Sequence, residues 1–145
     1  MPVPLIYKDQ ITLQATIGDV WKALTDPDLT KEYMYGCRAV TDWKVGSSLI
    51  WRGAADGVDY VIGQVVKYEP GSRLTFTVFD PNAGYEDKPE NYLTSEYTLS
   101  AVDDSTVIKI AQHDFSQVEN GEKRFEEAAA GWQYALEGLR KLLES

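Results

Sequence analysis

His113 and Asp114 are adjacent near the end of a β-like run, and they are the pair in this sequence that most resembles an acid–base couple. A histidine can remove a proton while a neighbouring carboxylate orients the ring. Adjacent residues of a strand point to opposite faces, so these two side chains are not expected to meet. No Gly-x-Ser-x-Gly turn or other nucleophile motif accompanies them. We therefore predict no catalytic residue, and we expect His113 to face away from any binding cavity.

Metal or cofactor chemistry has few candidate residues. Cys37 is the only cysteine and His113 the only histidine, whereas a zinc site draws on several such ligands. The carboxylates are scattered, without a spacing typical of a metal site or of a paired acid and base. Arg52, beside Trp51 in a β-like run, could pair with an anionic group of a ligand, although an outward, solvated position is favoured. No metal and no cofactor are expected.

The aromatic residues indicate a different kind of site, a pocket for an apolar molecule. Four Trp, nine Tyr and four Phe are present, and Tyr and Trp combine an apolar body with one polar tip that can orient a ligand. Core packing is the simpler interpretation for each aromatic taken alone, but as a group they favour a lined cavity. The candidate ligand-binding residues are Trp51, Tyr60, Phe76, Tyr97, Gln112, Phe125 and Trp132.

The alternation of side chains between the two faces of a strand selects the polar residues among these candidates. Ser95 and Tyr97 fall on one face of their run. Across the next hairpin Gln112 is expected to share that face, because Lys109 belongs on the face that meets water. Tyr97 and Gln112 are therefore the best candidates for polar groups inside the pocket.

The elements that would position these residues change in type along the chain. Residues 5–13 are typical of a strand, and residues 16–19 carry a capping pattern that begins a short helix, followed at Asp26 and Pro27 by a second one. Residues 80–91 form a polar loop long enough to be a lid or a mobile connection. Short β-like runs with turn residues between them favour antiparallel hairpins, and they lie at about 35–41, 47–53, 58–68, 73–80, 92–100 and 105–114.

A long amphipathic helix is predicted over about residues 120–143. Its apolar residues fall on one stripe, which must pack on something large, and the sheet is the available surface. Gly131 and Gly138 lie near the edge of this stripe. They either leave room for a ligand or a close approach of the sheet, or are tolerated surface glycines.

Charge and composition exclude several classes of function. There are 14 basic and 23 acidic residues, a net charge of −9, and no basic cluster, so binding to nucleic acid or to anionic membranes is not expected. The segment Met1–Pro4 has neither a basic nor an apolar run, so no signal peptide is expected, and no stretch is long and apolar enough to insert into a membrane. The single cysteine fits a reducing, cytoplasmic location.

Four segments resemble, in order, one branch of the SRPBCC or START-like superfamily, the activator of heat-shock-protein-90 ATPase homologues. They are VWKALTDP at 20–27, DWKVGS at 42–47, GQVV at 63–66 before Glu69-Pro70, and GW at 131–132 followed by Leu136 and Leu139. The resemblance implies an α+β helix-grip fold, with a curved antiparallel sheet of about seven strands, two short helices and a long C-terminal helix.

The resemblance also implies a single START-like ligand-binding domain over residues 1–145. We expect non-enzymatic binding of a small hydrophobic molecule between the sheet and the last helix. The alternatives are an enzyme like the polyketide aromatases and cyclases, which needs an acid or base in the pocket, and a chaperone-associated interaction module with an exposed apolar patch. A homodimer is compatible with each of the three.

Overall fold

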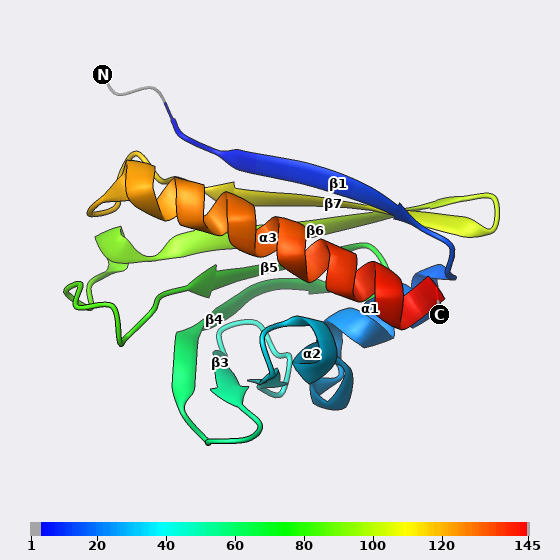
Figure 1. The fold of residues 1–145 in the computed structure, drawn as a ribbon, viewed down its shortest axis with the longest axis horizontal. Coiled ribbons are helices and arrows are strands. Elements are labelled where there is room, and N and C mark those ends of the chain that lie inside the picture. The colour runs from blue at the N-terminus through cyan, green and yellow to red at the C-terminus, as the bar shows by residue number, and fades with distance from the viewer. Residues whose placement is uncertain (1–3, 145) are drawn as a thin grey trace.

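The computed structural model describes residues 4–144; residues 1–3, on which part of the signal-peptide expectation rests, lie outside the described residues. The predicted order of elements is confirmed, and the fold is an α+β helix grip with a seven-stranded antiparallel sheet (Figure 1). In chain order the elements are β1 (Tyr7–Leu13), α1 (Ile17–Thr25), α2 (Pro27–Tyr33), β2 (Cys37–Val40), β3 (Ser48–Gly53), β4 (Asp59–Glu69), β5 (Arg73–Val78), the 3₁₀ turn η1 (Pro89–Asn91), β6 (Leu93–Val102), β7 (Ser105–His113) and α3 (Gly121–Glu144).

The strands follow the order β1-β7-β6-β5-β4-β3-β2, so that hairpin partners are neighbours and β1 closes the far edge beside β7. Register shifts between Trp51 and Arg52 and between Val65 and Lys67 mark irregularities in β3–β4 and β4–β5 pairing. Such irregularities bend and twist a strand pair. The sheet therefore curves, and α3 lies across its inner face (Figure 1).

The two short helices begin where their caps predict. Thr16 Oγ1 accepts a hydrogen bond of 3.2 Å from the amide of Asp19, and Asp26 accepts one from the amide of Asp28 with Pro27 in the first turn. The run expected over 35–41 differs, because the strand starts only at Cys37. Tyr35 and Gly36 have φ values of 55° and 76°, a left-handed conformation that lies outside the extended backbone of a regular strand.

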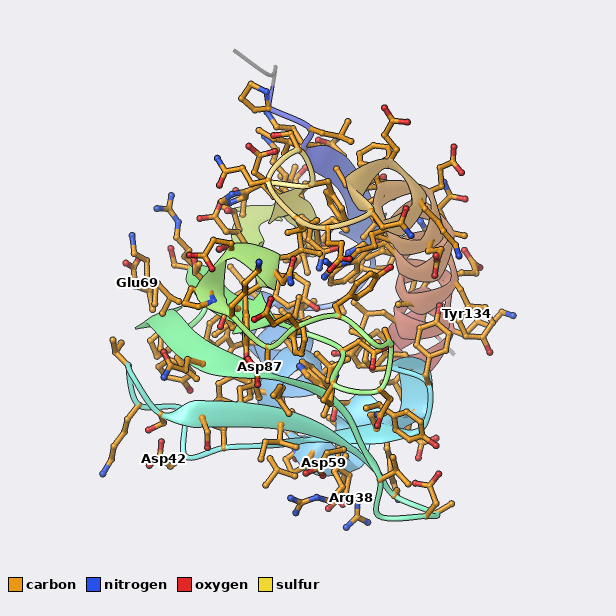
Figure 2. All side chains as sticks on the ribbon, turned by 90° about the vertical axis from the view of Figure 1, so that its left-hand side faces the viewer. Arg38, Asp42, Asp59, Glu69, Asp87 and Tyr134 are labelled. Carbon is orange, nitrogen blue, oxygen red and sulfur yellow. The ribbon has the colours of Figure 1, made fainter. Side chains whose placement is uncertain are left out.

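The two halves of α3 have different neighbours. Its C-terminal half packs solidly, with Ala135, Leu136 and Leu139 buried against the sheet and the short helices. A Cβ on Gly138 would lie 3.1 Å from Cβ of Tyr33, so this glycine permits the close approach of α2. The N-terminal half, from Arg124 to Gly131, lies instead over the open space described below. Tyr134 projects outward from the helix (Figure 2).

Candidate ligand-binding cavity

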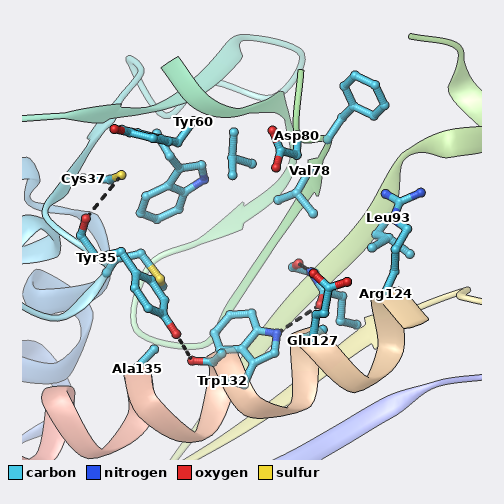
Figure 3. Close-up of a pocket in the computed structure, with 18 of the residues that line it drawn as sticks. Tyr35, Cys37, Tyr60, Val78, Asp80, Leu93, Arg124, Glu127, Trp132 and Ala135 are labelled. Carbon is cyan, nitrogen blue, oxygen red and sulfur yellow. Dashed lines mark hydrogen bonds between the residues drawn. The ribbon is translucent and has the colours of Figure 1, made fainter. Parts of the chain in front are cut away.

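A cavity of about 800 Å³ lies between the inner face of the sheet and the N-terminal half of α3 (Figure 3). Its volume falls within the range of about 300–1,000 Å³ typical of small-molecule sites. It is lined by Met34, Tyr35, Cys37, Trp51, Tyr60, Val61, Phe76, Val78, Phe79, Asp80, Ala83, Tyr85, Leu93, Ser95, Gln112, Arg124, Glu127, Ala128, Gly131, Trp132 and Ala135. Space of this size is far more than close-packed side chains leave in an ordinary core.

Packed aromatic rings form the inner wall. The ring of Phe76 lies 5.9 Å from that of Trp51 and 5.8 Å from that of Tyr97, centroid to centroid. Trp132 reaches down from α3 and meets Tyr97 edge to face at 5.7 Å. Such ring pairs hold one another in place, so the aromatic side of the cavity is rigid and apolar.

A short chain of hydrogen bonds crosses this apolar wall and is called here the polar floor: Trp132, Gln112 and Ser95. Nε1 of Trp132 donates to Oε1 of Gln112 at 3.1 Å, and Nε2 of Gln112 donates to Oγ of Ser95 at 2.9 Å. Gln112 and Ser95 are direct cross-strand partners on β7 and β6, and both are buried. The polar floor thus places a few fixed polar atoms in an otherwise apolar cavity, as ligand sites do.

The entrance to the cavity carries the charged and exposed side chains. Asp80, Glu127 and Tyr60 are exposed. Arg124 donates to the carbonyl oxygens of Asn91 (3.0 Å) and Glu119 (3.4 Å). Burial lowers the pKa of the Arg124 guanidinium, against the nearby acidic groups that raise it.

The loop predicted at 80–91 is anchored to α3 at this entrance. The guanidinium carbon of Arg124 lies 4.7 Å from the centre of the Tyr85 ring, and the Tyr85 hydroxyl accepts from Nδ2 of Asn120 at 3.2 Å. A cation over an aromatic face at this distance is attractive. Arg124 therefore holds the loop beside the cavity instead of presenting a free charge to it.

The opposite side of the entrance is held by Tyr35. Its hydroxyl donates to the carbonyl oxygen of Gly131 at 2.9 Å (Figure 3). Its ring stacks on that of Tyr134, with the two ring centroids 5.1 Å apart. A Cβ on Gly131 would lie 3.3 Å from that hydroxyl oxygen, so the glycine gives Tyr35 room to reach the helix. Behind Tyr35, Cys37 is buried, and burial raises the pKa of its thiol.

Of the seven residues predicted from the sequence, the structure brings five together around the cavity, namely Trp51, Tyr60, Phe76, Gln112 and Trp132. Tyr97 shares their face, but it lies beneath Phe76 and Trp132 and does not line the cavity. Burial raises its pKa far above the usual value. Phe125 is turned to the other side of α3, where its ring packs edge-on against Tyr7 and Phe115.

The other sequence candidates for chemistry lie apart from the cavity. Arg52 pairs with Asp59, Nε to Oδ1 at 2.7 Å, at a partly exposed position. Nε2 of His113 lies 3.9 Å from Oε2 of Glu96 on the outer face of the sheet, as the parity argument predicted. Asp114 accepts instead from Ser116 and from the amide of Leu5. His113 and Asp114 therefore form no hydrogen-bonded couple.

Several lining residues were missed by sequence reasoning, chiefly Tyr35, Cys37, Tyr85 and Arg124. Tyr35 and Tyr85 belong to irregular segments that carry no periodic pattern. Across residues 4–144, no three His, Cys, Asp or Glu side chains cluster in a way that could hold a metal ion. None of the helices in that part of the chain combines the length and hydropathy of a membrane span.

Comparison with known proteins was made on both sequence and structure. The family model described as activator of Hsp90 ATPase homolog 1-like protein matches residues 14–144. No curated protein matches the sequence.

Several solved structures share the fold over nearly the whole chain. The solution structure of ChR145 from Cytophaga hutchinsonii is 34% identical with a TM-score of 0.79, covering 99% of this chain and 97% of that one. The crystal structure of CalU16 from Micromonospora echinospora is 23% identical with a TM-score of 0.74, covering 95% and 75%. The solution structure of the Aha1 dimer from Colwellia psychrerythraea is 17% identical with a TM-score of 0.72, covering 97% and 96%.

Proposed function

Since the chain belongs to the family of activator of Hsp90 ATPase homolog 1-like proteins, we propose that it binds a small, largely apolar molecule in the cavity between its sheet and α3. The observation that carries the proposal is the cavity of about 800 Å³ with a preformed aromatic wall and a buried polar floor. A protein interior is normally close-packed. A wall of Trp and Phe rings left uncovered gains stability when an apolar surface replaces water there.

The ionisable groups favour binding over turnover. The carboxylates that line the cavity, Asp80 and Glu127, are exposed at the entrance, and Arg124 is bonded to backbone carbonyls. The polar floor offers only neutral groups, which orient a ligand without exchanging protons readily. The thiol of Cys37, with its raised pKa, is held in the protonated form that is a weak nucleophile.

The expected affinity follows from ligand size. At about −0.3 kcal/mol per non-hydrogen atom, a ligand of about 25 such atoms binds with a Kd on the order of micromolar.

The chaperone-associated alternative rests on a smaller feature, the exposed stack of Tyr35 on Tyr134. Two rings make a small patch for docking another protein.

A homodimer is compatible with ligand binding in this cavity. The Colwellia psychrerythraea relative was solved as a dimer, and we extend that assembly to this chain only as a proposal. Sedimentation velocity at several protein concentrations tests it: a single species of monomer mass throughout would rule the dimer out.

The binding proposal is tested with the neutral dye N-phenyl-1-naphthylamine, whose fluorescence rises in apolar surroundings. We expect saturable binding to the wild-type protein and strong weakening in Ala128→Trp, because Ala128 lines the cavity and the indole ring would occupy it. Ala130→Trp is the matched control, since Ala130 is exposed two residues along the same helix. Equal dye binding by the two variants, or none by the wild type, would contradict the proposal.

A further inference from the structure

The orientation of the Gln112 side chain is fixed by chemistry. Nε1 of Trp132 lies 3.1 Å from the Gln112 amide, and an indole N–H can only donate, so the atom facing it must be the oxygen. The amide nitrogen then faces Ser95 and donates to its hydroxyl oxygen at 2.9 Å. The polar floor therefore has one direction, from Trp132 through Gln112 to Ser95.

With this orientation, two hydrogen-bond donors of the polar floor make no hydrogen bond to residues 4–144. The Gln112 Nε2 group carries two hydrogens and uses one of them on Ser95. The Ser95 hydroxyl accepts that bond, and it makes no bond as donor to any of residues 4–144. Ser95 is 1% exposed and Gln112 7%, and both line the cavity. Buried donors of this kind need an acceptor, which the cavity side of the floor must provide.

We propose that the ligand carries a neutral oxygen acceptor, of the carbonyl type found in ketones, quinones and esters, that accepts hydrogen bonds from both Ser95 and Gln112. The inference rests on the proposed function and names the chemical class of its ligand. The two donor atoms are 2.9 Å apart. Because the two N–H bonds of an amide group diverge, an oxygen about 3 Å from each donor atom accepts a straight hydrogen bond from Ser95 and a bent one from Gln112. The aromatic wall of Trp51 and Phe76 covers the apolar remainder of the molecule.

The surroundings favour a neutral oxygen over a carboxylate. Among residues 4–144, the one guanidinium that lines the cavity, on Arg124, is already bonded to two backbone carbonyls. Asp80 and Glu127 line the same cavity and would repel an anion. An anion on the polar floor would have no positive partner and would be expensive to bury.

The test compares 9-fluorenone with fluorene, which share a ring skeleton and differ in a carbonyl group against a methylene group. Each compound is titrated into the wild-type protein with bound N-phenyl-1-naphthylamine, and the ratio of the two displacement affinities is the measured quantity. We expect Ser95→Ala and Gln112→Met each to lower the preference for fluorenone about fivefold, because each variant removes one of the two hydrogen bonds. Ser100→Ala, at the exposed end of the same strand, is the control and should leave the ratio unchanged.

The outcomes separate this inference from the binding proposal. In one outcome the wild type binds the dye and fluorene, and the fluorenone-to-fluorene affinity ratio of Ser95→Ala and Gln112→Met equals that of the wild type. That outcome would overturn the inference and leave the proposed function standing. A wild-type protein that binds neither the dye nor fluorene would overturn both. Thermal unfolding by circular dichroism confirms that each variant is folded, and either variant alone decides the question if the other fails to fold.

Discussion

The two glycines in the interior of α3, Gly131 and Gly138, should respond in opposite directions to the same substitution. Glycine in a helix interior is about 1 kcal/mol less favourable than alanine. On helix propensity alone, Gly131→Ala and Gly138→Ala would therefore each stabilise the protein by about that amount. The neighbours of the added methyl group decide whether the gain survives.

At Gly138 the methyl group meets a rigid surface. It would lie 3.1 Å from Cβ and 3.4 Å from Cα of Tyr33. Tyr33 is buried and its hydroxyl is bonded to the carbonyl of Ala23 at 2.8 Å, so α2 cannot yield locally. Overpacking of this kind costs about 1–3 kcal/mol. We expect Gly138→Ala to be neutral or destabilising by up to about 2 kcal/mol.

At Gly131 the methyl group meets only the hydroxyl of Tyr35, at 3.3 Å. That hydroxyl is the far end of a flexible side chain, and Tyr35 is 58% exposed, so the hydroxyl can move the few tenths of an ångström that the methyl group requires. Since the hydrogen bond to the Gly131 carbonyl is weakened at worst, about 0.5–1 kcal/mol of the propensity gain should remain.

Urea unfolding at constant protein concentration measures the difference in stability between the two variants, expected at about 0.5–3 kcal/mol. Ala130→Gly, at an exposed position of the same helix, calibrates the intrinsic term and should destabilise by about 1 kcal/mol. Equal stabilisation by both alanine variants would refute the close contact between α2 and α3.

Three further outcomes can be checked on the same protein. Thr75→Val should stabilise it by about 1 kcal/mol in urea unfolding, because the buried hydroxyl of Thr75 has no hydrogen-bond partner among residues 4–144. Hydrogen bonds from Ser116 and the amide of Leu5 lower the pKa of Asp114. The stability that these bonds contribute is present above about pH 4 and is lost as the pH falls further. Asp114→Asn should therefore reduce the loss of stability at acid pH in a plot of unfolding free energy against pH. Phe125→Ala should destabilise the protein by about 2 kcal/mol, through lost packing with two rings, and leave the affinity of the folded protein for N-phenyl-1-naphthylamine unchanged.

The faces of the strands were predictable from the sequence. The pairing of Ser95 with Gln112 and of Tyr97 with Ile110 confirms the shared inner face deduced from alternation. A strand allows no other arrangement once one residue is assigned, because its side chains alternate strictly. The helix caps at Thr16 and Asp26 were also predictable from the sequence, since they depend on contacts within a few residues.

The position of the cavity along the sheet was not predictable in the same way. Tyr97 and Gln112 share a face, yet Trp132 covers the first and bonds to the second. That outcome depends on where α3 settles on the sheet, which no local pattern encodes. Phe125 illustrates the same limit, because its place on the apolar stripe did not reveal which side of the helix faces the open space.

A cytoplasmic location stays a prediction.

The strand order has a consequence for synthesis on the ribosome. Tyr7 of β1 pairs with Gln112 of β7, about a hundred residues later in the chain. At about 5–20 residues per second, the first strand waits on the order of ten seconds for its partner. The helix that roofs the cavity, α3, is made after all seven strands. A nascent chain therefore completes its hydrophobic core and the walls of its cavity in one late step, and β1 has no strand partner until then.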